Sequence, residues 1–353
     1  MKHQNGSESQ KDQPQLTPIS KLGEFGLIDH LTKNFHPKHP TTVKGIGDDA
    51  AVIDNRGKLT VVSTDMLVEG IHFDFIYTPL KYLGYKSVVV NLSDIYAMNA
   101  TPKQITVSIA VSSRFTVEAL DEFYAGVAEA CHFYNVDLVG GDTSSSHKGM
   151  IISITAIGEA NPDELVYRSG AQEKDYICVS GNLGAAYLGL QILEREKRLY
   201  LEDPNIKPEL DTFPYLVERQ LKPEARNDIM DILRNAQIKP TAMIDVSDGL
   251  SSDILHICKQ SNVGCRLFEE NIPLHAQTAE AAQTFNLSPI TCALNGGEDY
   301  ELLFTIPPHQ INQLEGVHGI GIIGRITHPK EHPTLFTSGG QTHRLIAQGW
   351  RHV

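Results

Sequence analysis

The spacing of hydrophobic and polar residues predicts a chain in which strands and helices alternate. Short apolar or alternating runs predict strands at 59–64, 104–111, 150–157, 176–180, 265–268, 300–306 and 320–326. Longer amphipathic patterns predict helices at 79–100, 116–134, 183–198, 224–236 and 250–261. Pro79 suits the first turn of its helix, and Thr116 is expected to cap the next one. The polar stretch 199–215 is expected to be a loop.

This order of elements is typical of an α/β or α+β protein, and the pattern leaves both open. The segment Asn161-Pro162-Asp163 interrupts the pattern and predicts a domain boundary. We therefore expect an N-terminal domain over 21–159 and a C-terminal domain over 160–353. Residues 1–20 are polar and are expected to form a disordered tail.

The charge balance limits the partners that the chain can be expected to have. Its 353 residues include 30 Lys and Arg against 43 Asp and Glu, a net charge of −13. So acidic a chain is a poor candidate for binding nucleic acid or an anionic membrane. It can still bind phosphates, provided that local donors or bridging cations offset the repulsion between the two anions.

The five cysteines contain no C-x-x-C pair, which favours reduced thiols in a cytoplasmic protein. No apolar run approaches the roughly 18 residues of a membrane helix, and the polar N-terminus has no signal-peptide core. We therefore expect a cytoplasmic protein without a membrane partner.

Acidic residues recur at strand ends, at glycine turns and inside an apolar helix. They are Asp48, Asp49, Asp65, Asp94, Asp142, Asp245, Asp248, Glu298 and Asp299. A carboxylate in such a place needs a hydrogen-bond donor, an opposite charge or a metal ion. A single Asp at a glycine turn more often closes the turn. The recurrence instead favours Mg²⁺, which prefers oxygen ligands and often shares a substrate phosphate.

Ser87, Asn91 and Asp94 share one face of the helix predicted from Pro79. The face suits either a metal site or a buried hydrogen-bonding stripe, and the sequence leaves both interpretations open.

The segment 45–50 also fits the dinucleotide fingerprint G-x-G-x-x-G/A, with Asp65 near the expected ribose-binding spacing. We reject this interpretation because Asp48 and Asp49 would repel a pyrophosphate at the helix N-terminus. The turn Asp54-Asn55-Arg56-Gly57 also interrupts the required helix. Since the sequence lacks a G-x-x-x-x-G-K-[ST] loop as well, any ATP site must be of another kind.

Four further candidates have an ordinary alternative each. His72 could bind a substrate or lie on the surface, and Arg168 could clamp a phosphate or form an exposed ion pair. The segment 181–184 could cradle an anion or simply join a strand to a helix. Trp350 could stack on an aromatic ligand or fold the tail onto the domain.

A series of short motifs extends from about residue 21 to the end of the chain. They are Gly23-Glu24-Phe25, Gly45-Ile46-Gly47-Asp48-Asp49-Ala50, Ser63-Thr64-Asp65, His72-Phe73, Asn91-Leu92-Ser93-Asp94, Gly140-Gly141-Asp142-Thr143, Arg168-Ser169-Gly170, Asp245-Val246-Ser247-Asp248-Gly249-Leu250 and Gly296-Gly297-Glu298-Asp299-Tyr300-Glu301-Leu302. In this order they resemble the motifs of the thiamine-monophosphate kinase family. The family has Gly-Tyr-Asp-His near its C-terminus, where this chain has Gly349-Trp350-Arg351-His352.

The resemblance implies a role for each matched residue. The implied metal ligands are Asp49, Ser63, Thr64, Asp65, Asp94, Asp142, Asp245 and Asp248. The implied catalytic residues are Asp49, Asp65, Asp94 and Asp245. The implied ATP contacts are Gly141, Asp142, Arg168 and Ser247. The implied contacts to thiamine monophosphate are His72, Glu298 and Trp350.

The resemblance further implies a two-domain fold like that of aminoimidazole ribonucleotide synthetase, with a ferredoxin-like N-terminal domain and an α/β C-terminal domain. It implies a homodimer formed through the N-terminal sheet, several Mg²⁺ ions, and K⁺ as an additional candidate. The expected reaction is direct in-line transfer of a phosphoryl group from ATP to thiamine monophosphate, the last step of thiamine diphosphate biosynthesis. Another ATP-dependent enzyme of the superfamily, such as a purine-type synthetase, and a non-catalytic nucleotide sensor are the alternatives.

Overall fold

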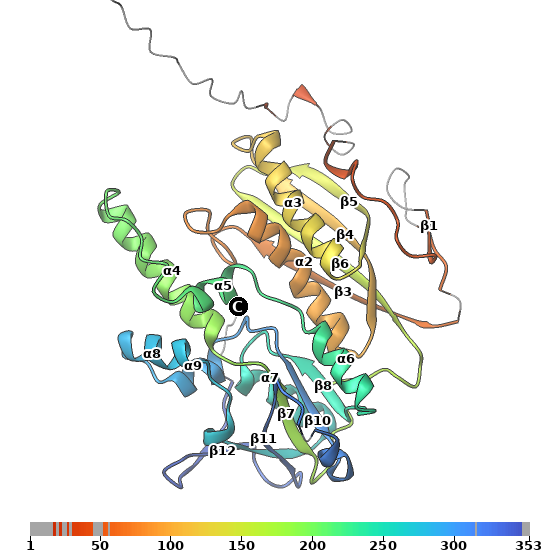
Figure 1. The fold of residues 1–353 in the computed structure, drawn as a ribbon, viewed down its shortest axis with the longest axis vertical. Coiled ribbons are helices and arrows are strands. Elements are labelled where there is room, and N and C mark those ends of the chain that lie inside the picture. The colour runs from red at the N-terminus through yellow and green to blue at the C-terminus, as the bar shows by residue number, and fades with distance from the viewer. Residues whose placement is uncertain are drawn as a thin grey trace, which may run out of the picture.

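The fold is that of a computed structural model, shown in Figure 1. It describes residues 17–18, 21–22, 27, 30–44, 52–55, 57–314 and 316–347. Asp48, Asp49 and Trp350 lie outside the described residues, as does most of the expected tail over residues 1–20. At the N-terminal end the short strands β1 (Thr42–Lys44) and β2 (Val52–Ile53) pair antiparallel.

The N-terminal half is a four-stranded sheet covered on one face by two helices (Figure 1). Its strands are ordered β3-β6-β4-β5, and all neighbours are antiparallel except β4 and β5. The strands are β3 (Leu59–Val68), β4 (Thr101–Val111), β5 (Asp137–Ser145) and β6 (Met150–Ala160). The helices are α2 (Leu80–Ala97) and α3 (Val117–Phe133). The Thr116 hydroxyl accepts a hydrogen bond from the amide of Ala119 at 3.3 Å, which confirms the predicted cap.

Alternate residues of β4 and β6 are buried, because only one face of the sheet packs on the helices. On the opposite face, the segment 38–44, which includes β1, covers Gln104 and Asp137 at one corner through hydrogen bonds. The described elements leave the rest of this face uncovered. It exposes apolar side chains, including Val62 at 61% and Met66 at 57% of their surface. We call this surface, which consists of the even-numbered residues 62–66 of β3 and their neighbours on β4, β5 and β6, the outer face.

The helices α2 and α3 cross at two glycines. A Cβ added to Gly84 would lie 1.9 Å from the carbonyl oxygen of Phe123, and one added to Gly126 would lie 1.8 Å from that of Lys81. Only glycine permits this approach of the two backbones. The close contact fixes α2, whose far end supplies the site described below.

The C-terminal half contains a seven-stranded mixed sheet in the order β13-β12-β9-β11-β7-β10-β8. Its strands are β7 (Tyr176–Ser180), β8 (Ala242–Asp245), β9 (Gly264–Phe268), β10 (Leu302–Ile306), β11 (Ile320–Thr327), β12 (Thr334–Phe336) and β13 (Thr342–Arg344). Its helices are α4 (Ala185–Glu202), α5 (Pro214–Leu221), α6 (Asn227–Asn235), α7 (Leu250–Ser261), α8 (Ala276–Thr284) and α9 (Pro289–Asn295). Two short 3-10 helices span Glu269–Asn271 and Pro308–Leu314. None of the described helices is long and apolar enough to cross a bilayer.

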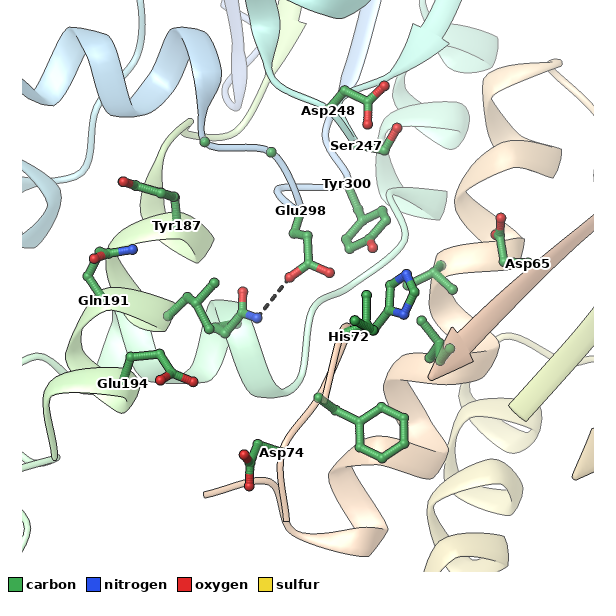
Figure 2. A pocket seen from close by; sticks show the side chains of 18 of the residues that line it. Asp65, His72, Asp74, Tyr187, Gln191, Glu194, Ser247, Asp248, Glu298 and Tyr300 are labelled. Atoms are coloured by element: carbon green, nitrogen blue, oxygen red, sulfur yellow. Dashed lines mark hydrogen bonds between the residues drawn. The ribbon is translucent and has the colours of Figure 1, made fainter. Parts of the chain in front are cut away.

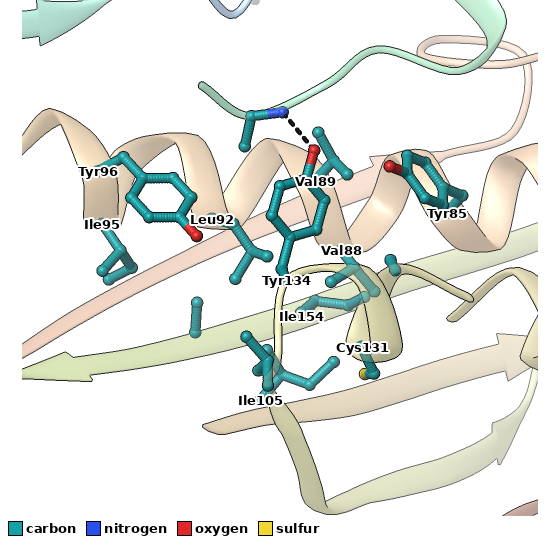
Figure 3. Packing of buried hydrophobic residues seen from close by; sticks show 14 of the residues in the cluster. Tyr85, Val88, Val89, Leu92, Ile95, Tyr96, Ile105, Cys131, Tyr134 and Ile154 are labelled. Carbon is teal, nitrogen blue, oxygen red and sulfur yellow. Dashed lines mark hydrogen bonds between the residues drawn. The ribbon is translucent and has the colours of Figure 1, made fainter. Parts of the chain in front are cut away.

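The two halves share one hydrophobic core. The largest buried cluster joins α2, α3 and the first sheet to residues of α6, β8 and β10. Figure 3 shows Tyr134, at the end of α3, among Val88, Leu92 and Ile154, with its hydroxyl oxygen accepting the amide of Ala225 at 2.9 Å. The mixed α/β class is therefore confirmed, whereas the domain limits near residue 160 stay a prediction.

Candidate active site

A cavity of about 980 Å³ lies between the N-terminal and C-terminal halves. The first half contributes the end of β3, the segment 70–77 and residues of α2. The second half contributes α4, the turn after β8 and the turn before β10. Figure 2 shows Asp65 and His72 on one side of the cavity, Tyr187, Gln191 and Glu194 on the other, and Glu298 between them.

Three carboxylates from different elements line one end of this cavity. They are Asp65 on β3, Asp94 on α2 and Asp245, which is the last residue of β8. The helix α2 connects them, because Asn91 accepts the amide of Asp65 at 2.9 Å and Ser93 donates to Asp245 at 2.7 Å.

A second hydroxyl belongs to the same group, since Ser63 donates a hydrogen bond to Asp94. The hydrogen-bonding interpretation of the polar face of α2 therefore holds for Asn91 and Asp94, whereas the metal interpretation stays a prediction. Asn91 and Asp94 face β3, whereas Ser87 only donates back to the carbonyl of Gly84 on its own helix.

The electrostatics of this cluster favour a cation. Burial, followed by the negative charge of Asp94, raises the pKa of Asp245 to about 7 from 3.8. The same two causes raise the pKa of Asp65 to about 6. Burial also raises the pKa of Asp94, and Arg168 opposes the shifts of Asp94 and Asp245 without cancelling them. A bound cation would relieve both the desolvation and the mutual repulsion.

The donor set suits Mg²⁺ in an open site. Among the described residues no three His, Cys, Asp or Glu side chains converge closely enough to hold a metal ion alone. Mg²⁺ usually takes one or two carboxylates and completes its shell with water and substrate phosphates. Carboxylates and hydroxyls spread along a cavity wall fit that coordination. A closed structural metal site would instead need several ligands that converge on one point.

A strained turn before β10 presents Glu298 to the cavity. Gly297, Glu298 and Tyr300 have φ angles of 73°, 56° and 51°, in the left-handed region that side chains normally avoid. The amide of Glu298 donates to the carbonyl of Ser247 at 2.8 Å, and that of Tyr300 donates to Val246 at 2.9 Å. These bonds join the turn to the segment after β8, so that Ser247, Asp248 and Glu298 line the same cavity.

Side-chain contacts also connect the segment 70–77 to α4. The ring nitrogen Nδ1 of His72 accepts the amide of Val68 at 3.0 Å, which orients the ring toward the cavity (Figure 2). Farther along, Tyr77 donates to Glu194 at 2.9 Å, and Lys197 forms an ion pair with Asp74 at 2.9 Å. This part of the lining is polar but, unlike the cluster, its charges are paired.

Comparison with known proteins agrees with this geometry. The profile of the AIR synthase related protein, N-terminal domain, matches residues 47–160. The thiamine-monophosphate kinase of Aquifex aeolicus is 34% identical over 335 residues, which cover 95% of this chain and 99% of the relative. The chain belongs to the thiamine-monophosphate kinase family.

Solved structures of this family have the same fold. "AaThiL complexed with AMPPCP and TMP" superposes with a TM-score of 0.73 at 34% identity, over 95% of this chain and 98% of that one. The thiamine-monophosphate kinase of Stenotrophomonas maltophilia gives a TM-score of 0.75 at 30% identity, over 90% and 97% of the two chains. A hydrogenase maturation protein, HypE, at 19% identity and a TM-score of 0.71, shares the fold alone.

The structure gathers part of the site that the family motifs imply. The same cavity is lined by Asp65, His72, Asp94, Asp245, Ser247, Asp248 and Glu298. Thr64 also borders it, but its hydroxyl donates to the carbonyl of Ile154 at 3.1 Å, within the sheet. Arg168 is exposed and acts on Asp94 and Asp245 through its charge.

Two other residues with family roles lie apart from the cavity. Gly141 and Asp142 are on β5, at the opposite edge of the sheet from β3. Three strand spacings of roughly 4.8 Å separate the two edges, or about 14 Å. Asp142 belongs to the outer face and is exposed. One chain therefore does not bring it to the carboxylate cluster.

Sequence reasoning missed the buried polar partners of Glu298. Lys86 on α2 and Gln220 on α5 both donate to its Oε2 atom, at 3.1 and 2.8 Å. A lysine among the apolar residues of the predicted helix was the available signal, because a buried ammonium group needs an anion. The segment 181–184 is a strand–helix turn whose Gly184 amide donates to Asp299 at 2.6 Å, so the protein's own carboxylate fills the candidate anion site.

Proposed function

We propose that this chain phosphorylates thiamine monophosphate with ATP and so forms thiamine diphosphate. The observation that carries the proposal is the cavity between the halves, which is lined by partly buried carboxylates of β3 and α2, the buried Asp245 of β8, Glu298 and His72. A relative that aligns over 95% of the chain is described as a complex with AMPPCP and TMP, which supports the same pair of substrates.

We further propose that Mg²⁺ ions bind at Asp65, Asp94 and Asp245, with Ser63, Thr64 and Asp248 as additional ligands. Asp49, and Asp142 from a second chain of the proposed homodimer, complete the proposed ligand set, and K⁺ is an additional candidate cation. When bound, Mg²⁺ supplies positive charge that screens two polyanionic substrates and stabilises charge on the transferring group.

The chain's own residues then bind and orient the reactants. Ser63 and Ser93 fix Asp94 and Asp245 through hydrogen bonds. His72 and Glu298 are placed to contact the acceptor, with Trp350 as a further proposed contact. Transfer to the phosphate oxygen of thiamine monophosphate is proposed to be direct and in line. That oxygen is already anionic and needs no strong general base, so positioning supplies much of the catalysis.

We propose a homodimer formed through the outer face. This surface is exposed and partly apolar, as expected for an interface between subunits. Gly141 and Asp142 lie at one edge of the sheet and would be brought toward a second chain. Together with Arg168 and Ser247 they are the proposed ATP contacts.

The domain limits, 21–159 and 160–353, remain a proposal, which the separation of the two sheets supports. A cytoplasmic location is a further proposal. The five cysteines are all buried and unpaired, as expected in a reducing compartment.

The proposed function is tested by incubating the protein with ATP, Mg²⁺ and thiamine monophosphate and separating the thiamine phosphates by chromatography. Thiamine diphosphate should accumulate in proportion to enzyme, and chelation of the metal with EDTA should stop it. Folded protein that forms no thiamine diphosphate under these conditions would contradict the proposal.

A further inference from the structure

Lys86 is a buried cation on α2 whose side chain reaches into the C-terminal half. Only 3% of the residue is exposed. Its ammonium donates to the carbonyl of Gln220 at 2.9 Å and to Oε2 of Glu298 at 3.1 Å. Burying a charge is costly unless it is paired, so the position needs a reason beyond helix packing.

The two hydrogen-bond partners of Lys86 are Glu298 and Gln220, and Gln220 also binds Glu298. The amide nitrogen of Gln220 donates to the same oxygen, Oε2, at 2.8 Å. Glu298 itself keeps 29% of its side chain exposed, at the cavity. Within the part of the chain that the structure describes, no hydrogen bond is made by the other oxygen, Oε1. Two donors on one oxygen therefore leave Oε1 as the atom that Glu298 offers to a ligand.

Hydrogen bonds also hold the residues that follow Glu298 in the chain. Arg219 donates to the carbonyl of Asp299 at 2.6 Å and to the carboxylate of Glu301 at 2.9 Å. Ser180 donates to the other oxygen of Glu301 at 2.5 Å. A left-handed conformation at a residue such as Glu298 is unfavourable and persists only where its surroundings over-determine it. Here hydrogen bonds restrain both the turn and its side chain.

We propose that Lys86, assisted by Gln220, is a positioning residue that aims Oε1 of Glu298 at the acceptor substrate. The inference rests on the proposed function, because it takes the cavity as the acceptor site. Lys86 also offsets the charge of Glu298, so this wall presents an oriented hydrogen-bond acceptor rather than another free anion. A substrate that carries a phosphate group then meets less electrostatic repulsion at this wall.

The test compares Lys86→Met with Lys81→Met, in steady-state assays with ATP and thiamine monophosphate. Both variants remove one positive charge from α2, but Lys81 is 47% exposed and pairs with Glu129. Loss of a hydrogen bond to a charged group predicts a rise of about ten- to a hundredfold in KM for thiamine monophosphate in Lys86→Met. KM for ATP should change by less than about threefold, and Lys81→Met should resemble the wild type.

Gln220→Met keeps the proposal testable if Lys86→Met does not fold. It removes the second donor to Oε2 without removing a charge, and KM for thiamine monophosphate should rise about three- to tenfold. An unchanged KM for the acceptor in a folded Lys86→Met or Gln220→Met would overturn the proposal. So would an equal rise in KM for both substrates.

A double-mutant cycle separates positioning from a merely structural role. If Lys86 acts through Glu298, Lys86→Met should add less than about twofold to the KM effect of Glu298→Gln. If instead the KM effects of Lys86→Met and Glu298→Gln multiply in the double variant, Lys86 acts elsewhere and the proposal is overturned. Wild-type protein that forms no thiamine diphosphate would instead contradict the proposed function, so the two failures are distinguishable.

Discussion

At Asp245 the stability of the fold and the binding of a cation place opposite demands on one carboxylate. It is the last residue of a fully buried strand, it lies beside Asp94, and one hydroxyl donates to it. Such a carboxylate destabilises the fold when it is ionised and no cation is bound. The residue is therefore expected to lower stability in return for binding a cation.

Replacement of Asp245 by Asn should separate these two effects. With Mg²⁺ present, kcat should fall at least about a hundredfold. The proposed Mg²⁺ ion, which stabilises charge on the transferring phosphoryl group, loses a ligand in this variant. Without Mg²⁺, at pH 8, Tm should rise, because a desolvated charge has been removed. Asp231→Asn, at an exposed ion pair, is the matched control and should leave both quantities unchanged. A lower Tm for Asp245→Asn would contradict this prediction.

The raised pKa values also set the pH dependence of stability without metal. Asp65 and Asp245 have pKa values of about 6 and about 7 when folded, against 3.8 for the ordinary carboxyl. Between about pH 4 and 7 the folded chain therefore binds more protons than the unfolded chain. Stability from these groups is greatest below that window and is lost as the pH rises through it.

Urea unfolding in EDTA at pH 5 and pH 8 measures this effect. The stability of wild type relative to Asp245→Asn should be lower at pH 8 than at pH 5, and Mg²⁺ should reduce the difference. A relative stability that rises with pH would refute the assignment.

At the scale of elements, the helix α2 organises the site because it faces three directions. Asn91 and Asp94 contact β3, Ser93 contacts β8, and Lys86 reaches Glu298. The crossing with α3 holds this helix in register. Small changes at the crossing should therefore disturb residues that lie far from it.

Gly126→Ala tests the crossing. Its added Cβ would lie 1.8 Å from the carbonyl oxygen of Lys81, which is backbone and cannot rotate away. We expect a loss of about 3 kcal/mol in the free energy of unfolding, as for severe overpacking. Ala125→Gln, at the exposed neighbouring position, should change stability by less than about 0.5 kcal/mol. Urea denaturation checks both values, and wild-type stability in Gly126→Ala would contradict the close approach.

The hydrophobic pattern could predict the long elements because their periods are strong. The strand predicted at 176–180 and the helix at 250–261 coincide with β7 and α7. The expected loop 199–215 was wrong at both ends, since α4 continues to Glu202 and α5 begins at Pro214. The strand predicted from 300 begins at Leu302, because tertiary hydrogen bonds hold residues 297–300 in a turn.

The site could be predicted only as far as its acidic residues are visible in the sequence. Asp65, Asp94 and Asp245 stand out because acids in apolar elements are unusual. Lys86 and Gln220 did not, because their importance depends on a partner more than 70 residues away that only the fold brings near. Pairings across such distances leave no periodic pattern in one sequence.

At the scale of the whole molecule, the proposed homodimer depends on the outer face. The proposed dimer would bury Val62 and Met66, which are exposed in the single chain. The double substitution Val62→Glu with Met66→Glu would place two charges in that interface. Charge repulsion and desolvation should then dissociate the dimer.

Light scattering after size exclusion checks this prediction. Wild type should have twice the chain mass of 39.0 kDa, and the double variant should have the chain mass. Phe133→Glu, at an exposed position on the end of α3, should remain dimeric. A wild-type protein with the mass of one chain would contradict the proposed homodimer.

The location of the cavity between the two halves has a consequence for biosynthesis. The first 160 residues contain Asp65 and Asp94, but Asp245 and Glu298 emerge from the ribosome much later. A nascent or prematurely terminated chain of that length therefore lacks one wall of the cavity, and it also lacks the residues of α6, β8 and β10 that complete the shared core. No truncated product should compete for substrate, since half of the binding surface does not exist until nearly the whole chain has been made.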